Sequence, residues 1–156
     1  MRDKCLVCER IERILNNANP YFVAELETGY VVLGDFQYFK GYALLLCKKH
    51  KTELHHLDSG FRMNFLREMS ELAEAVNIAF KPSKINYELL GNSNSHMHWH
   101  IFPRFEDDPK PDSPIWCIDK AIRCSENTKP DLKELERIKS VLLAALRKTA
   151  MNIKSC

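Results

Sequence analysis

One short segment, HMHWHIF at residues 96–102, constrains the fold of this chain more than any other part of the sequence. His96, His98 and His100 alternate with apolar residues along it. Because side chains of a β-strand point alternately to its two faces, an extended segment with this pattern has three imidazoles on one face and apolar side chains on the other. We therefore predict a strand that is anchored by its apolar face and presents its histidines together on the opposite face.

Other apolar runs predict further strands around this one. The runs YFVAELE and YVVLGDF are separated by only Thr28 and Gly29, a spacing typical of a β-hairpin. The run from Tyr42 to Cys47 is apolar throughout, which indicates a strand covered on both faces. A further strand is expected from Lys84 to Leu90, before the turn that leads to Met97–Phe102.

Three segments have the pattern of helices. The first runs from about Cys5 to Leu15, and the second, from about Gly60 to Phe80, repeats apolar residues at three- and four-residue spacing after the capping candidate Asp58. The last begins at Pro130 and Asp131. It is predicted to turn five apolar side chains inward: Leu132, Leu135, Ile138, Leu142 and Leu146. These elements predict an α+β domain, an antiparallel sheet of about five strands with a long helix and a C-terminal helix on it.

Length and composition fit a single globular domain at residues 1–156. The net charge is only +2 and Lys and Arg are spread along the chain, so no nucleic-acid partner is predicted. The opening MRDKCLVCERIERIL is too charged for a signal peptide, and no apolar run is long enough to span a membrane. We expect a cytoplasmic protein with no membrane partner, whose six cysteines are thiols or metal ligands rather than disulfides.

Three neighbouring imidazoles suit chemistry at phosphorus. The ordinary pKa of imidazole lies between about 5 and 8, so one ring can act as a neutral nucleophile while a neighbour donates a proton or carries charge. Oxygens around a phosphorus atom need hydrogen-bond donors, and the preceding turn offers Asn92, Ser93 and Ser95. Arg104, four residues after His100, is a further candidate for binding the same anion.

The histidine strand has two other interpretations. Histidines in a strand often have structural roles, with their ring nitrogens satisfied by neighbouring groups. All three can also hold one catalytic zinc ion, since some hydrolytic enzymes bind zinc through three histidines and a water molecule. The spacing of the residues is compatible with each interpretation.

A second candidate site begins with CLVC, in which Cys5 and Cys8 have a spacing that lets two thiolates reach one metal ion. The sequence has no second pair of this kind, so histidines are the candidates to complete a structural zinc site. His50 follows the third predicted strand and His96 begins the histidine strand. Either meets the cysteine pair if the two strand ends are neighbours; the alternative is that Cys5 and Cys8 are plain reduced thiols.

Taken in their order along the chain, these segments resemble the histidine-triad family. Its signature is His-φ-His-φ-His-φ-φ, with φ apolar, and HMHWHIF matches all seven positions. CLVCERI resembles the family's N-terminal C-x2-C segment, and LLLCKKHKTELHHL resembles its strand followed by Lys-Lys-His or Lys-Arg-His. LLGNSNSHMHWHIFPRF, with the later PIW, resembles a bacterial-type branch often labelled diadenosine tetraphosphate hydrolases. The resemblance covers a core of about residues 5–116 and leaves a loop and helix at 117–156.

The resemblance implies roles for individual residues. In such proteins the middle histidine of the triad, here His98, attacks the α-phosphorus of a nucleotide, and water then cleaves the nucleotidyl-histidine. His100 matches a histidine that contacts the phosphate, and Ser93 matches a serine on the phosphate side. Asp35 matches a position that binds ribose hydroxyls, with a solvated loop carboxylate as the alternative. His96 completes the catalytic triad.

The resemblance also implies a metal and an oligomer. In zinc-bearing members the ion is held by the two cysteines, the histidine after the third strand and the first histidine of the triad, which here are Cys5, Cys8, His50 and His96. Such a zinc ion is structural, because it places the strand without taking part in bond making. Family members usually form homodimers, often through a strand and a long helix.

This chain departs from the family pattern at two positions. Cys47 stands where many members have proline, a change that a buried strand is expected to tolerate. Tyr42 stands where many members have a histidine after glycine, which puts in doubt the hydrogen bond that this histidine would make to the active site. Trp116, in the loop after the histidine strand, is expected either to stack on a base or simply to pack.

From these features we expect a nucleotide hydrolase that acts on dinucleoside polyphosphates or similar adenylated compounds. A transferase would form the same covalent intermediate and pass the nucleotide to an acceptor other than water. A regulator that binds nucleotides but turns them over slowly is the third possibility.

Overall fold

The computed structural model describes residues 5–150 and 152–156, so residues 1–4 and 151 of the predicted domain lie outside the described part. The strands are β1 (Phe22–Glu25), β2 (Gly29–Leu33), β3 (Ala43–Cys47), β4 (Lys84–Glu88) and β5 (His98–Arg104). The α-helices are α1 (Leu6–Leu15), α2 (Ser59–Phe80), α3 (Lys120–Arg123) and α4 (Leu132–Thr149). Short 3-10 helices lie at Leu54–His56, Ile115–Cys117 and Glu126–Thr128.

The five strands form one sheet in the order β1-β2-β3-β5-β4, with every neighbouring pair antiparallel. This confirms the predicted α+β class and the predicted sheet. The histidine strand β5 lies inside the sheet, between β3 and β4, with Leu46 opposite His98 and Leu44 opposite His100. Two neighbouring strands therefore hold the backbone that carries these histidines.

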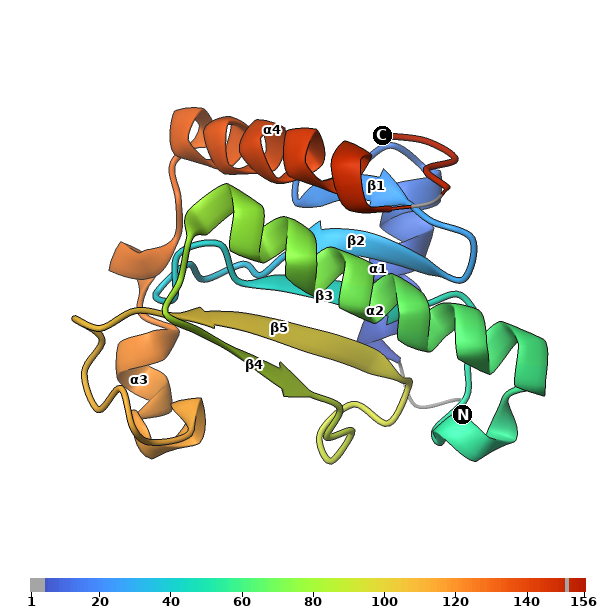
Figure 1. The fold of residues 1–156 in the computed structure, drawn as a ribbon, viewed down its shortest axis with the longest axis horizontal. Helices are drawn as coiled ribbons and strands as arrows, with labels where there is room; N and C mark the ends of the chain where they lie inside the picture. Colours follow the sequence, from blue (N-terminus) through green and yellow to red (C-terminus); the bar gives the residue numbers. More distant parts are fainter. Residues whose placement is uncertain (1–4, 151) are drawn as a thin grey trace.

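One face of the sheet is covered by α2 and α4, which lie in front of it in Figure 1. The core on this side joins buried residues of both helices to the inward side chains of the strands. Asp58 caps α2 by accepting from the amide of Phe61, and Asp131 caps α4 by accepting from the amide of Glu134. Hydrophobic burial between these layers fixes the strand on which the histidines lie.

The opposite face of the sheet is only partly covered. Helix α1 packs there through Val7 and Ile14, against Val32 and Leu46 of the sheet, and lies behind the sheet in Figure 1. The segment 115–118, which follows β5, packs on the same side against Phe102. A part of this face between α1 and the segment 115–124 stays open, and the histidines lie beneath that opening.

Two details of the predicted elements were wrong. Leu132 was expected to face inward, but it is 80% exposed, because it occupies the first position of α4 and lies beyond the side chains that meet the sheet. β5 begins at His98, so His96 lies just before the strand, although Met97 still exchanges backbone hydrogen bonds with Lys51 and Cys47. Within the described residues, no helix has both the length and the apolar character needed to cross a bilayer.

Candidate active site and metal centre

The predicted alternation of apolar residues and histidines appears in the structure from Met97 onward, while His96 lies before the strand. Met97 and Ile101 are buried in the core under α2, and Trp99 packs against the same core. His98 and His100 point to the other face and line the open pocket. Their rings lie 4.6 Å apart between centroids, so the two imidazoles can act on one small group.

His98 is fixed by a hydrogen bond within its own strand. It is 8% exposed, and its Nδ1 lies 2.7 Å from the backbone oxygen of His96. A carbonyl oxygen can only accept, so Nδ1 carries the proton and Nε2 keeps a free lone pair. Burial lowers the pKa of His98, which favours the neutral ring. A neutral imidazole with one free lone pair is a suitable nucleophile.

His100 has a different partner. Its Nδ1 lies 2.6 Å from the hydroxyl of Tyr42, on the residue just before β3. Burial, together with the neighbouring His98, lowers the pKa of His100 to about 4. The ring is therefore neutral near pH 7, and it stacks on Phe102 with a centroid distance of 5.7 Å. The doubt that the sequence raised about Tyr42 is resolved, because this tyrosine does make a hydrogen bond to the triad.

The pocket above these histidines has a volume of about 270 Å³ and opens between α1 and the segment 115–124. Its floor is the sheet, with apolar side chains from β2 and β3 beside the two histidines. Asn94, Trp116 and Arg123 line other parts of its wall. A pocket with apolar walls and a few converging polar groups is the usual form of a small-molecule site.

Asp35 lines this pocket, and it has a partner that sequence reasoning missed. Arg10, on α1, donates to both carboxylate oxygens of Asp35, at 2.8 and 2.5 Å. Both side chains are partly exposed to the pocket, at 24% and 30%. The ion pair joins residues 25 positions apart, so no local pattern in the sequence could have indicated it.

The turn before the strand contributes less than predicted. Asn92, Ser93 and Ser95 are all exposed, while Asn94 is the turn residue that lines the pocket. Among the described residues that line the pocket, Asn92, Ser93 and Ser95 do not occur. Because Asn94 and His98 line the same pocket, a phosphate bound over His98 would lie near this turn. Phosphate binding by Asn92, Ser93 and Ser95 therefore remains a proposal.

Arg104 does not join the pocket. It is 3% exposed, and its guanidinium donates to Asp108, to Asn86 and to the backbone oxygens of Ser113 and Lys110. The loop after β5 thus folds back over Arg104 and uses its donors. These bonds indicate that Arg104 anchors the loop after β5. The anion-binding role expected from its position four residues after His100 is not supported.

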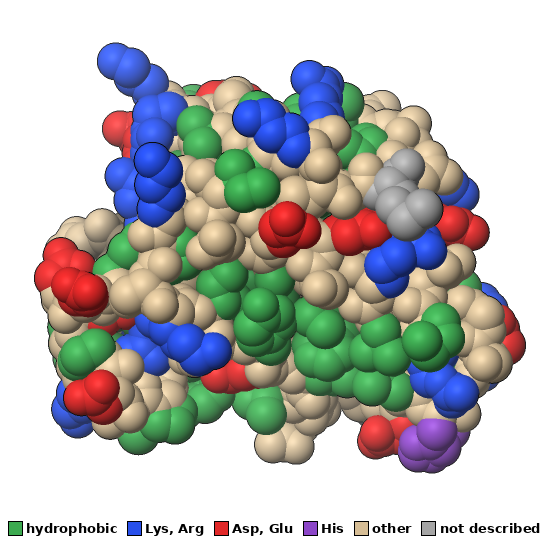
Figure 2. Space-filling view, in the orientation of Figure 1, with side chains coloured by type: hydrophobic (Ala, Val, Ile, Leu, Met, Phe, Trp, Pro, Cys, Tyr) green, Lys and Arg blue, Asp and Glu red, His purple; other side chains and the backbone are tan. Residues whose placement is uncertain are grey.

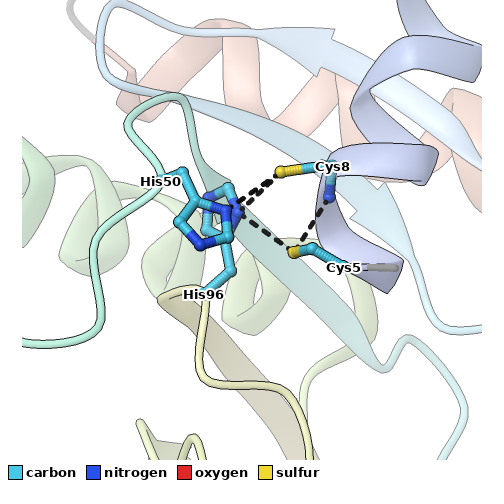
Figure 3. Close-up of side chains that lie close together, drawn as sticks. All are labelled: Cys5, Cys8, His50 and His96. Carbon is cyan, nitrogen blue, oxygen red and sulfur yellow. Dashed lines mark hydrogen bonds between the residues drawn. The ribbon is translucent and has the colours of Figure 1, made fainter. Parts of the chain in front are cut away.

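The predicted cysteine and histidine set forms one cluster (Figure 3). Sγ of Cys8 lies 3.1 Å from Nδ1 of His50 and 3.4 Å from Nδ1 of His96, and Sγ of Cys5 lies 3.5 Å from the same His96 nitrogen. The four ligand atoms all lie within 4.8 Å of one another. In a tetrahedral zinc site with bonds of about 2.0–2.3 Å, neighbouring ligand atoms are about 3.3–3.8 Å apart. The donor set therefore fits a zinc ion in type and number, and the three sulfur–nitrogen distances above lie close to the tetrahedral spacing.

The fold explains why these four residues meet. Antiparallel pairing of β3 with β5 places the residues after β3 beside those before β5, which brings His50 close to His96. His96 is 1% exposed, and its Nε2 donates to the backbone oxygen of Cys47 at 2.8 Å. That bond leaves Nδ1 with a lone pair directed at the cysteines, the usual arrangement for a histidine that binds metal.

Comparison with known proteins agrees with this architecture. A family model described as HIT domain matches residues 17–107. Protein hit of Bacillus subtilis (strain 168) is 26% identical to this chain in an alignment of 108 residues, and the match covers 66% of this chain and 72% of that protein.

Solved structures with the same fold include two histidine triad proteins. One, a hypothetical histidine triad nucleotide-binding protein from Sulfolobus tokodaii strain7, has a TM-score of 0.69 and 19% identity, over 90% of this chain and 93% of that one. The other, a Zn-bound histidine triad family protein from Mycobacterium smegmatis, has a TM-score of 0.64 and 19% identity, over 93% and 94%. At these identities the likeness shows the fold.

Proposed function

The chain belongs to the HIT domain family, and on this basis we propose that it is a nucleotide hydrolase of the diadenosine tetraphosphate hydrolase-like branch. It cleaves dinucleoside polyphosphates or other adenylated compounds at the α-phosphate. The observation that carries the proposal is the free Nε2 lone pair of His98, which opens into the pocket because Nδ1 is bound to the His96 backbone. A nucleophile poised in this way beside a second neutral imidazole suits attack on phosphorus.

The proposed reaction has two steps. In the first, Nε2 of His98 forms a bond to the α-phosphorus while the bond from phosphorus to the bridging oxygen breaks, and the remaining phosphate chain leaves with that electron pair. In the second, a water oxygen bonds to the same phosphorus, the P–N bond breaks and returns its electron pair to Nε2 of His98, and the water releases a proton to solvent. His100 supports both steps as a neighbour of the reacting phosphate, 4.6 Å from His98 between ring centroids.

The two sides of the pocket suit the two parts of a nucleotide. Asp35 lies in the wall on the α1 side, where its carboxylate oxygens can accept from ribose hydroxyls while Arg10 keeps the carboxylate in place. Apolar side chains of α1 and of the sheet line the same side and offer a surface for a base. In this pose Ser93, Ser95 and Asn92 on the turn lie on the phosphate side.

We propose zinc as the ion held by Cys5, Cys8, His50 and His96. The geometry of the four ligand atoms supports this, as does the zinc bound in the relative from Mycobacterium smegmatis. A zinc ion with four protein ligands has no open position for a substrate, so its contribution is structural. It would connect the start of α1 to the segment before β5, and so fix the position of Arg10 on α1 relative to His98 on β5.

We further propose that the protein forms a homodimer. β4 is the outer strand of the sheet beyond β5, and its outer edge has no strand partner among the described residues. Figure 2 shows a band of apolar side chains on the face that carries α2. The large exposed apolar residues of these two elements are Met63 and Ile78 on α2 and Tyr87 on β4, and Leu90, just after β4, is exposed as well. A second copy of this chain that continues the sheet would cover both features.

Rapid quench with a radiolabelled diadenosine polyphosphate tests the proposed chemistry. We expect an acid-labile nucleotidyl adduct that forms in a burst in the wild type and is absent in His98→Ala. His55→Ala, a change of the same kind at an exposed histidine outside the pocket, is the control and should keep the burst. Turnover without an adduct, or an adduct that survives in His98→Ala, would contradict the proposal.

The products identify which reaction follows the adduct. A hydrolase releases the nucleoside monophosphate with oxygen from water, which labelled water reveals. A transferase gives a different product when inorganic phosphate or a sugar phosphate is added. An adduct that persists without product release would mark a nucleotide-binding regulator. Diadenosine polyphosphates, adenosine phosphoramidate and adenosine phosphosulfate form the first substrate panel.

A further inference from the structure

We propose that Tyr42 is a positioning residue that holds His100 in the tautomer with the proton on Nε2, so that His100 donates a hydrogen bond to the substrate phosphate. The inference deepens the proposed function and rests on it for the identity of the ligand. Its basis is the 2.6 Å contact between the Tyr42 hydroxyl and Nδ1 of His100. The chemistry of these two groups fixes which atom donates.

The hydroxyl is the donor in this contact. Burial raises the pKa of Tyr42, so its phenol stays protonated. In the described part of the chain, Nδ1 of His100 is the only hydrogen-bond partner of this hydroxyl. A buried hydroxyl proton needs an acceptor, and Nδ1 is the one within reach. Nδ1 therefore bears the lone pair, and the single proton of the neutral imidazole is on Nε2.

Packing holds the tyrosine ring in the position that this bond requires. The ring stacks on Phe102 at 4.0 Å between centroids, with an interplanar angle of 9°. Gly34, the residue after β2, leaves room for it, because a Cβ atom at that position would lie 2.1 Å from the Tyr42 ring. A ring confined between Gly34 and Phe102 has little freedom to turn its hydroxyl away from His100.

The two pocket histidines are then in opposite tautomers. His98 carries its proton on Nδ1, because it donates to the His96 backbone oxygen, and presents a lone pair on Nε2. His100 carries its proton on Nε2 and presents a donor. One ring is thus prepared to attack phosphorus and the other to bind a phosphate oxygen, although both are neutral imidazoles on one strand.

Long-range nitrogen–proton NMR on the purified protein tests the tautomer without substrate. We expect His100 in the wild type to show an unprotonated Nδ1 and a protonated Nε2. In Tyr42→Phe the ring packing on Phe102 is kept and the donor is lost, so a measurable fraction of His100 should shift to the Nδ1-protonated form. Tyr30→Phe, the same change on β2 outside the pocket, is the control and should leave His100 unchanged.

Kinetics test the consequence for the substrate. Tyr42→Phe should lower kcat/KM by about tenfold, the loss that corresponds to about 1.4 kcal/mol. Tyr42→His should recover part of it, because an imidazole N–H can donate to Nδ1 in place of the hydroxyl. A merely structural tyrosine would lower stability in both variants without changing the tautomer of His100.

Different results would contradict the positioning role of Tyr42 and the proposed hydrolase activity. A wild-type His100 protonated on Nδ1, or a tautomer ratio that Tyr42→Phe does not change, would overturn the inference even in an active enzyme. A changed tautomer with unchanged kcat/KM would also overturn it, since the bond would then have no effect on the substrate. Absence of turnover in the wild type would contradict the hydrolase proposal, while the NMR result would still decide the tautomer.

Discussion

The guanidinium of Arg10 binds both carboxylate oxygens of Asp35 and so joins α1 to the segment after β2 across one wall of the pocket. This bidentate geometry orients the carboxylate and cancels its charge. An uncompensated carboxylate at that place would repel a phosphate bound over His98. If Asp35 binds ribose hydroxyls as proposed, the ion pair would keep its carboxylate compatible with an anionic substrate.

Arg10→Ala should weaken substrate binding. We expect KM to rise about tenfold, because hydrogen bonds to charged groups contribute about 1.5–3 kcal/mol and part of this loss is replaced by water. The preference for ribose over 2′,3′-dideoxyribose substrates should fall as well, since Asp35 loses its fixed orientation. Steady-state kinetics with the two substrates measures both effects.

Arg13→Ala is the matched control for this prediction. It changes an arginine of the same helix that donates to the backbone of Ala18 outside the pocket. It should leave KM and ribose preference at the wild-type values. An unchanged KM in Arg10→Ala would show that the ion pair has no role in binding the substrate.

Cys8→Ser should reduce bound metal and stability together. Serine is a poor zinc ligand, and a structural zinc ion contributes its binding free energy to folding. We expect less than one zinc ion per chain by elemental analysis and a lower Tm. Cys117→Ser, at an exposed cysteine outside the cluster, should change neither quantity. Loss of zinc without loss of Tm would contradict the structural role of the ion.

Much of the site was predictable because it depends on short-range patterns. Alternation along residues 96–102 was sufficient to predict that His98 and His100 share a face, since the strand period is two. The family pattern then indicated the four residues that form the cysteine and histidine cluster. Arg10 was missed because its partner lies on a different element, and ion pairs of this kind leave no periodic signal. Arg104 does belong to the histidine-bearing strand, but the loop that follows captures its guanidinium, which the sequence does not reveal.

Glu68→Gln should destabilise the fold. Glu68, on α2, is 3% exposed and accepts from the amides of Glu27 and Thr28 and from the Thr28 hydroxyl, in the turn between β1 and β2. In glutamine an NH2 group replaces one carboxylate oxygen. One of the three N–H and O–H donors around Glu68 would then face another donor in place of an acceptor. We expect a loss of about 1–3 kcal/mol in the free energy of unfolding, measured by urea denaturation.

The control for this prediction is Glu136→Gln, at an exposed ion pair on α4. It should change the free energy of unfolding by less than about 1 kcal/mol. Equal effects of the two substitutions would mean that the turn does not depend on the buried carboxylate.

The lowered pKa of His100 predicts that this residue makes the fold less stable in acid. Its pKa is about 4 in the folded protein, against about 6.5 in an unfolded chain. Between these values the unfolded state binds the proton more strongly, so stability is lost as the pH falls from about 6.5 towards 4.

His100→Gln removes this contribution while keeping an acceptor for the Tyr42 hydroxyl. Its free energy of unfolding should fall less between pH 7 and pH 5 than that of the wild type, by about 1–2 kcal/mol. Protonation of the cysteine and histidine cluster affects both proteins equally and cancels in the comparison. His55→Gln, at an exposed histidine, should keep the wild-type pH dependence. If His100→Gln also kept it, burial beside His98 would not be what holds the His100 ring neutral.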